Sequence, residues 1–158
     1  MPQDPSNPGA PPPSVTLIVR KTIRATPERL FDAWTRPEEL KKWWGPQSVT
    51  CIDAKVQPEV GGSYQIANQF PNGDVVWITG EYEIVDRPHR LVYTWRIGTS
   101  PGPPERVTVT FDRRGADTEV TITHERIPSQ PVRDVHEQGW LGCLDGLAVY
   151  LSENQSPG

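Results

Sequence analysis

The sequence predicts a single α+β domain built from one strand, two short helices, about six further strands and a long C-terminal helix. Apolar and polar residues alternate with the period of a β-strand over residues 15–23 and again over 49–125. Two short helical segments, each opened by a proline, lie between these regions, and the first has one apolar face. Residues 131–151 then have the period of a helix. A length of 158 residues fits one domain of this kind.

The domain is expected to cover residues 14–151. Residues 1–13 hold six of the 18 prolines and, after Met1, no large apolar side chain, so ordering this segment is not offset by burial. We therefore predict a disordered tail over 1–13. Residues 152–158 have a similar polar composition, and a second disordered tail is predicted there.

Composition and short motifs exclude several classes of function. A net charge of −4 with a pI near 5.4 lacks the basic surface that phosphate binding requires, so nucleic acid is a poor partner. No apolar run approaches the roughly 18 residues of a membrane helix. The first residues lack the basic start and apolar stretch of a secretory signal, which predicts a cytoplasmic protein. The sequence has no Walker loop, no GxGxxG and no GxSxG, so no cofactor is predicted.

The N-terminal elements follow from local signals. The alternation over 15–23 predicts a half-buried strand. Thr26 supplies a capping hydroxyl and Pro27 suits the first position of a helix. Pro37 ends this helix and begins a second one, which stops at Gly45.

Six strands fit between the turn signals of residues 49–125. Asn72-Gly73 is the strongest of these signals, because both residues tolerate the positive φ of a type I′ hairpin turn. The residues expected to face the core are Tyr64 and Ile66; Val76, Ile78, Tyr82 and Ile84; Leu91, Tyr93, Trp95 and Ile97; Val107, Val109 and Phe111; and Val120, Ile122 and His124.

The last helix has an apolar surface about half its circumference wide, which predicts heavy burial. It contains Gly139, Gly142 and Gly146, each of which costs about 1 kcal/mol relative to alanine inside a helix. Two interpretations stay open. The missing side chains leave room for a ligand between helix and sheet, or they allow close packing against bulky residues of the sheet.

Several separated motifs resemble one known family. They are residues 23–40 with Trp43-Trp44, then Gly61-Gly62, residues 80–84 and 90–95, and Gly139-Trp140 with Leu144 and Leu147. The chain is similar to the activator of heat-shock protein 90 ATPase homologue family, within the START-like, polyketide-cyclase and birch-pollen-allergen superfamily. The resemblance implies a helix-grip fold, in which a curved antiparallel sheet of about seven strands surrounds the long C-terminal helix. Arg36 stands where the family often has a capping Asp, so Thr35 is expected to cap the second helix instead.

The superfamily holds apolar ligands between sheet and helix, and the resemblance implies such a ligand here. Adjacent helical residues diverge by about 100°, so only one of Trp43 and Trp44 is expected to face inward, and Trp44 is assigned to the pocket. The predicted binding residues are Trp44, Tyr64, Ile78, Tyr93, Trp95, Val109, Ile122, His124, Gly139, Cys143 and Gly146.

Two other functions remain open. A cyclase or hydrolase is the first, since His124 and His136 could reach a common cavity and work with Glu125, Glu137 or Tyr93. A module that binds a chaperone is the second, on the family name alone. No catalytic residue is assigned, and Cys143 is expected to be a buried structural thiol.

No metal site is predicted. Cys51 and Cys143 lie about 90 positions apart without CxxC spacing, and His136-Glu137 lacks the second histidine of a zinc-binding helix. We expect the domain to fold without a metal or other cofactor.

Overall fold

The structure is a computed structural model that describes residues 14–45, 48–99 and 102–153. The predicted tail over 1–13 lies outside the described residues, as do residues 154–158 of the second tail. The last helix extends to Glu153, two residues beyond the expected end of the domain at 151.

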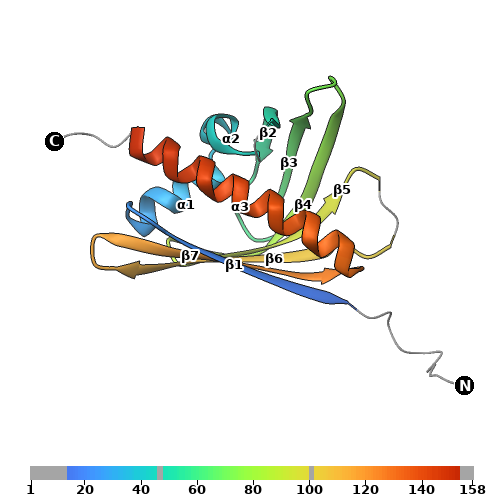
Figure 1. The fold of residues 1–158 in the computed structure, drawn as a ribbon. Helices are drawn as coiled ribbons and strands as arrows, with labels where there is room; N and C mark the ends of the chain where they lie inside the picture. The colour runs from blue at the N-terminus through green and yellow to red at the C-terminus, as the bar shows by residue number, and fades with distance from the viewer. Residues whose placement is uncertain (1–13, 46–47, 100–101, 154–158) are drawn as a thin grey trace, which may run out of the picture.

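The predicted order of elements is confirmed (Figure 1). Strand β1 is followed by the two short helices, six further strands and one long helix. Their bounds are β1 Val15–Ile23, α1 Pro27–Thr35, α2 Pro37–Trp43, β2 Thr50–Val56, β3 Ser63–Gln69, β4 Val75–Asp86, β5 Arg90–Ile97, β6 Glu105–Arg114, β7 Asp117–Ile127 and α3 Gln130–Glu153.

The seven strands form one antiparallel sheet in the order β1-β7-β6-β5-β4-β3-β2. The first strand pairs with the last, so the chain crosses the molecule through α1 and α2 and returns strand by strand. The pairing register shifts between β1 and β7, between β2 and β3, and between β4 and β5, and such irregularities bend a strand. The sheet therefore curves around α3, which packs against β1, β7 and α2 (Figure 1).

The caps of the short helices agree only in part with expectation. Thr26 caps α1, because its Oγ1 accepts a hydrogen bond from the backbone N–H of Arg29 at 3.1 Å. The expected capping of α2 by Thr35 is wrong. The hydroxyl of Thr35 donates to the carbonyl of Phe31 at 2.9 Å, and the N-cap residue of α2 is Arg36, which makes no side-chain cap.

The hairpin between β3 and β4 is present, but its predicted type I′ turn is wrong. Gly73 has φ of 93°, whereas Asn72 is not among the residues with positive φ. The N–H of Gly73 donates to the carbonyl of Phe70, and the N–H of Phe70 donates to the carbonyl of Asp74. This is a three-residue loop in which Pro71 occupies the first corner, a position that suits its fixed φ.

Candidate functional site

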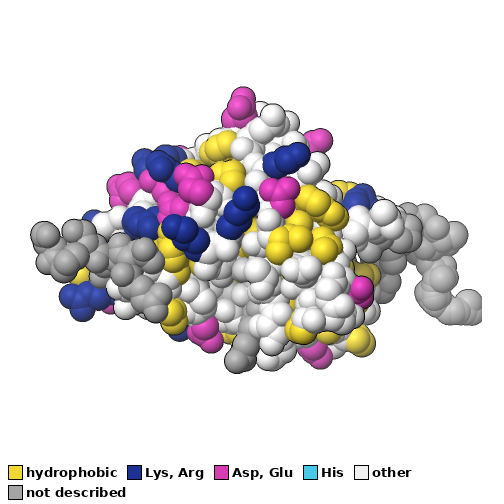
Figure 2. All heavy atoms as spheres, turned by 90° about the horizontal axis from the view of Figure 1, so that it is seen from above, with side chains coloured by type: hydrophobic (Ala, Val, Ile, Leu, Met, Phe, Trp, Pro, Cys, Tyr) yellow, Lys and Arg dark blue, Asp and Glu magenta, His cyan; other side chains and the backbone are white. Residues whose placement is uncertain are grey.

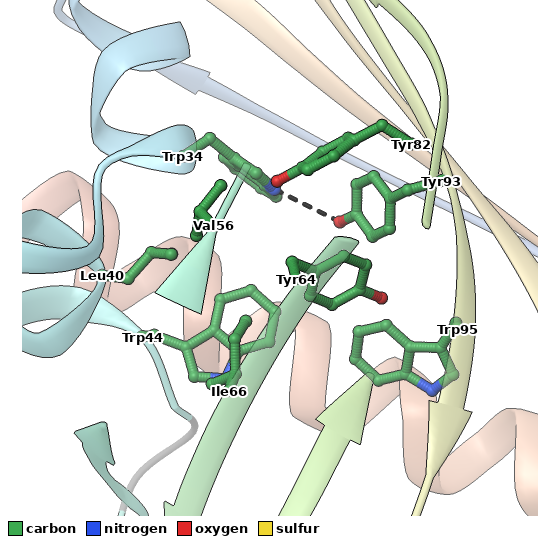
Figure 3. A pocket seen from close by; sticks show the side chains of 9 residues that line it. All are labelled: Trp34, Leu40, Trp44, Val56, Tyr64, Ile66, Tyr82, Tyr93 and Trp95. Atoms are coloured by element: carbon green, nitrogen blue, oxygen red, sulfur yellow. Dashed lines mark hydrogen bonds between the residues drawn. The ribbon is translucent and has the colours of Figure 1, made fainter. Parts of the chain in front are cut away.

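The innermost space between sheet and helices is almost filled. Nine side chains surround a void of only about 10 Å³, namely Trp34, Leu40, Trp44, Val56, Tyr64, Ile66, Tyr82, Tyr93 and Trp95 (Figure 3). The hydroxyl of Tyr64 donates to the carbonyl of Thr94 at 2.6 Å, and Nε1 of Trp34 donates to the hydroxyl of Tyr93 at 3.2 Å. A void of this size holds at most one water molecule, so this region is core.

A much larger space of about 720 Å³ opens beside this core. It is a groove between residues 135–145 of α3 and the inner face of β3, β4 and β5, and Trp44 also contributes to its lining. The residues that line it are Trp44, Val49, Asn68, Phe70, Ile78, Trp95, Val135, His136, Gln138, Gly139, Trp140, Leu141, Gly142, Cys143 and Asp145. We call this space the α3 groove.

Apolar side chains at the margin of the α3 groove are exposed. Phe70, Val135 and Leu141 line it and are 39%, 69% and 41% exposed. Figure 2 views the molecule from above and shows hydrophobic side chains gathered right of centre, whereas charged side chains concentrate on the left. The N-terminal end of α3 lies on the right in Figure 1, so the apolar gathering belongs to the half of the molecule with the groove.

Three residues that line the groove each have one polar side-chain atom without a hydrogen-bond partner. The atoms are Nε1 of Trp44, Nε1 of Trp95 and Oδ1 of Asn68, and they are the fully buried side-chain atoms without a partner in the described part of the chain. All three residues are more than nine-tenths buried and line the groove. Leaving such an atom unpaired costs about 1 to 3 kcal/mol, and because these atoms are fully enclosed by protein they do not face the open space of the groove.

The structure separates the predicted binding residues into groups. Trp44, Ile78, Trp95, Gly139 and Cys143 line the α3 groove. Tyr64 and Tyr93 surround the small inner void instead, together with Trp44 and Trp95, which line both spaces.

The remaining predicted residues lie elsewhere. Val109 and Ile122 are completely buried in the core and line neither space. A Cβ at Gly146 would lie 3.1 Å from the carbonyl oxygen of Trp43, so α3 packs closely on α2 at that point. A Cβ at Gly139 would meet nothing within 4 Å. The two interpretations of the helical glycines therefore apply to different positions.

His124 and His136 lie together, but they do not share a cavity, because His124 lines neither space, and their common partner is Glu105. Their rings stack with centroids 4.5 Å apart. Nε2 of His124 and Nε2 of His136 lie 2.7 Å and 2.9 Å from the same atom, Oε1 of Glu105. Nδ1 of His124 accepts a hydrogen bond from Nε1 of Trp140 at 3.0 Å. We call these four side chains the histidine network. Only His136 and Trp140 of this network line the groove.

Burial and hydrogen bonding set the charges in the histidine network. Burial raises the pKa of Glu105, but the hydrogen bonds from His124 and His136 outweigh it and hold the pKa at about 2. Burial lowers the pKa of His124 against the opposing effect of Glu105. The network therefore consists of a carboxylate that receives two hydrogen bonds and a neutral His124.

The donor chemistry of the network does not suit a metal ion, although its three donor atoms lie within 4.8 Å of one another. An indole N–H only donates, so the contact with Trp140 uses the lone pair on Nδ1 of His124. A neutral imidazole then carries its proton on Nε2, the atom that faces Glu105, and cannot ligate a cation there. The cluster is a hydrogen-bonded unit.

Cys143 lines the groove without the character of a nucleophile. Burial raises the pKa of its thiol to about 12, against a weaker opposing hydrogen bond with the backbone of Gly45. The thiolate is the reactive form of cysteine, and this environment suppresses it.

The sequence analysis did not identify Glu105 and Asn68 as residues of this region. The two-residue period of their strands could have shown that both side chains point inward. Glu105 precedes core-facing Val107 by two positions in β6, and Asn68 follows Ile66 by two in β3. Each polar residue therefore extends an inward-facing row, where its side chain reaches the space under α3.

Acid is expected to destabilise the protein through the histidine network. Glu105 has its ordinary pKa of 4.5 when unfolded and about 2 when folded, so its contribution is complete above about pH 4.5 and is lost as pH falls toward 2. His124 also lowers stability in acid. Burial lowers its pKa in the folded protein, so below about pH 6.5 the unfolded chain binds a proton more readily than the folded one does. Urea unfolding of Glu105→Gln should show a loss of about 2 kcal/mol at neutral pH, after allowance for partial exposure of the carboxylate.

The control for this prediction is Glu59→Gln, which removes one carboxylate from an exposed position. The difference between the Glu105→Gln variant and the parent protein should shrink as pH falls from 4.5 toward 2. A difference that stays constant over that range would contradict the assignment.

The described part of the chain has no helix that is both long and apolar enough to cross a membrane.

No protein of curated function matches the sequence. Solved structures match over nearly the whole chain. A protein of Chromobacterium violaceum shares 26% identity with a TM-score of 0.77, covering 86% of this chain and 96% of its own.

Two further structures agree in fold. An AHSA1 protein of Silicibacter pomeroyi shares 20% identity with a TM-score of 0.80, covering 89% of this chain and 100% of its own. A protein of Rhodobacter sphaeroides shares 22% identity with a TM-score of 0.78, covering 93% of this chain and 99% of its own. The family model described as "Activator of Hsp90 ATPase homolog 1-like protein" matches residues 24–152. A match over this much of the domain confirms the resemblance, and the chain belongs to that family.

Proposed function

We propose that the protein binds an apolar small molecule in the α3 groove. The observation that carries this proposal is a groove of about 720 Å³ whose described lining is mainly apolar and aromatic and includes a few polar side chains, among them Asn68, His136 and Gln138. Ligand sites typically measure roughly 300 to 1,000 Å³ and combine apolar walls with a few polar groups. The groove has both properties.

The glycine in the groove wall supports the proposal. Gly139 lies in the interior of α3, where glycine costs about 1 kcal/mol relative to alanine. No atom lies within 4 Å of the position where its Cβ would be. Packing therefore does not require a glycine here, whereas an open groove benefits from one.

Replacing Gly139 with leucine is expected to block the groove without unfolding the protein. The added side chain enters open space, so the stability of the variant should equal or exceed that of the parent by up to about 1 kcal/mol. Calorimetric titration with β-methoxynaphthalene, a neutral two-ring compound, should show binding weakened at least about tenfold, because the leucine occupies the space of the ligand.

Gly139→Ala is the matched control. It has the same gain in helix propensity, adds a single methyl group and should retain most of the binding. Equal affinity in the parent protein and in Gly139→Leu would place the ligand elsewhere. If neither binds this compound or a wider panel of apolar compounds, the small-molecule function gives way to the alternative of a module that binds a protein partner.

A further inference from the structure

We propose that the α3 groove selects a neutral aromatic ligand with a hydroxyl group, which donates a hydrogen bond to Nδ1 of His136. This inference rests on the proposed function, since it names the chemical class of the ligand of the same groove. It follows from the positions of two protons, which the contacts of the histidine network determine.

The first proton is that of His124. The indole N–H of Trp140 has no acceptor capacity, so it donates to Nδ1 of His124 across 3.0 Å. The neutral ring of His124 must then carry its proton on Nε2. That N–H donates to Oε1 of Glu105 across 2.7 Å.

The second proton is that of His136. Glu105 is ionised, with a pKa of about 2, so its oxygens only accept hydrogen bonds. Nε2 of His136 lies 2.9 Å from Oε1 of Glu105 and therefore also carries a proton. In a neutral ring this leaves a lone pair on Nδ1 of His136.

This lone pair is available to a ligand. Nδ1 of His136 has no hydrogen-bond partner among the described residues, and it is not among the fully buried unpartnered atoms. The residue itself is 8% exposed and lines the α3 groove. Stacking on His124 and the bond to Glu105 hold the ring in place, so the acceptor is oriented before a ligand arrives.

The surroundings of this acceptor define the rest of the ligand. The ring of Trp95 lies 6.1 Å from that of His136 and 6.2 Å from that of Trp44, which favours an aromatic body. Among the described residues that line the groove there is no lysine or arginine, and the one Asp or Glu, Asp145, is paired with Lys21 across 3.2 Å. An anionic acid finds no cation among these lining residues and has no proton to donate. A neutral phenol has the required donor and shape.

The test compares β-naphthol with its methyl ether, β-methoxynaphthalene, which has a similar body and lacks the donor. Titrations are made at mildly alkaline pH, where imidazole side chains are neutral. We expect the parent protein to bind β-naphthol about tenfold more tightly, the effect of one well-oriented hydrogen bond. His136→Phe should bind both compounds with similar affinity, because it retains an aromatic ring without the acceptor.

A second measurement needs no variant and no ligand. NMR of the ring nitrogens in the parent protein should show the proton of His136 on Nε2 and a free lone pair on Nδ1. A proton on Nδ1 would overturn the inference directly. Equal affinity of the parent protein for the two compounds would overturn it as well, while the proposed function stands. Failure of both compounds to bind would overturn this inference, and the wider panel of apolar compounds then decides the proposed function.

Discussion

Replacing Trp34 with alanine is expected to lower the free energy of unfolding by about 3 to 5 kcal/mol, the range for deleting a large buried aromatic side chain. Trp34 is 3% exposed and lies where α1 meets the sheet. Its ring centroid is 5.0 Å from Trp43, 5.9 Å from Phe111 and 6.2 Å from Trp140. The substitution also removes the hydrogen bond to the hydroxyl of Tyr93.

Urea unfolding measures this loss, and Trp77→Ala is its matched control. Trp77 lies in β4 and is 37% exposed, so its removal should cost much less. If the two substitutions lowered the free energy of unfolding by similar amounts, the burial of Trp34 would contribute no more to stability than an exposed tryptophan does. A loss of only about 1 kcal/mol in Trp34→Ala would show that its neighbours collapse into the space.

Replacing Gly80 with alanine is expected to cost about 3 kcal/mol or more, although only one methyl group is added. Gly80 lies opposite Tyr64 in the β3–β4 register. A Cβ at this position would lie 2.7 Å from the carbonyl carbon of Thr94 and 2.7 Å from Cε1 of Tyr64. The absence of a side chain allows the Tyr64 ring to reach the carbonyl of Thr94. Because one obstacle is backbone, the cost falls at the upper end for overpacking.

Thermal and urea unfolding of Gly80→Ala can be compared with Gly139→Ala, where the same change meets nothing within 4 Å. The two variants should move stability in opposite directions. If Gly80→Ala is as stable as the parent protein, β4 and β5 separate easily at this point, and the close approach of Tyr64 is not required for folding.

The architecture could be predicted from the sequence because it depends on periodicity. Alternation of apolar residues identified the strands, and capping residues such as Thr26 placed the start of α1. The Asn72-Gly73 signal identified a hairpin but not its geometry, since Pro71 allows a three-residue loop that the dipeptide alone does not reveal. Local signals determine where a turn lies more reliably than which backbone angles it uses.

The candidate site was harder to predict because it depends on volumes and on contacts between distant elements. Inward-facing positions do not reveal whether their side chains fill the space or surround it. Tyr64 and Tyr93 fill it, whereas Gly139 leaves it open. Glu105 lies 19 residues from His124 and 31 from His136, and only folding brings them to one oxygen atom.

The aromatic walls of the α3 groove have an optical consequence. Trp44, Trp95 and Trp140 line it, and they are half of the six tryptophans in the chain. Indole emission responds to local polarity and to nearby energy acceptors, so half of the chain's indole emitters report on this one surface. A molecule that enters the groove changes the surroundings of three emitters at once, and the protein signals its own occupancy without a dye.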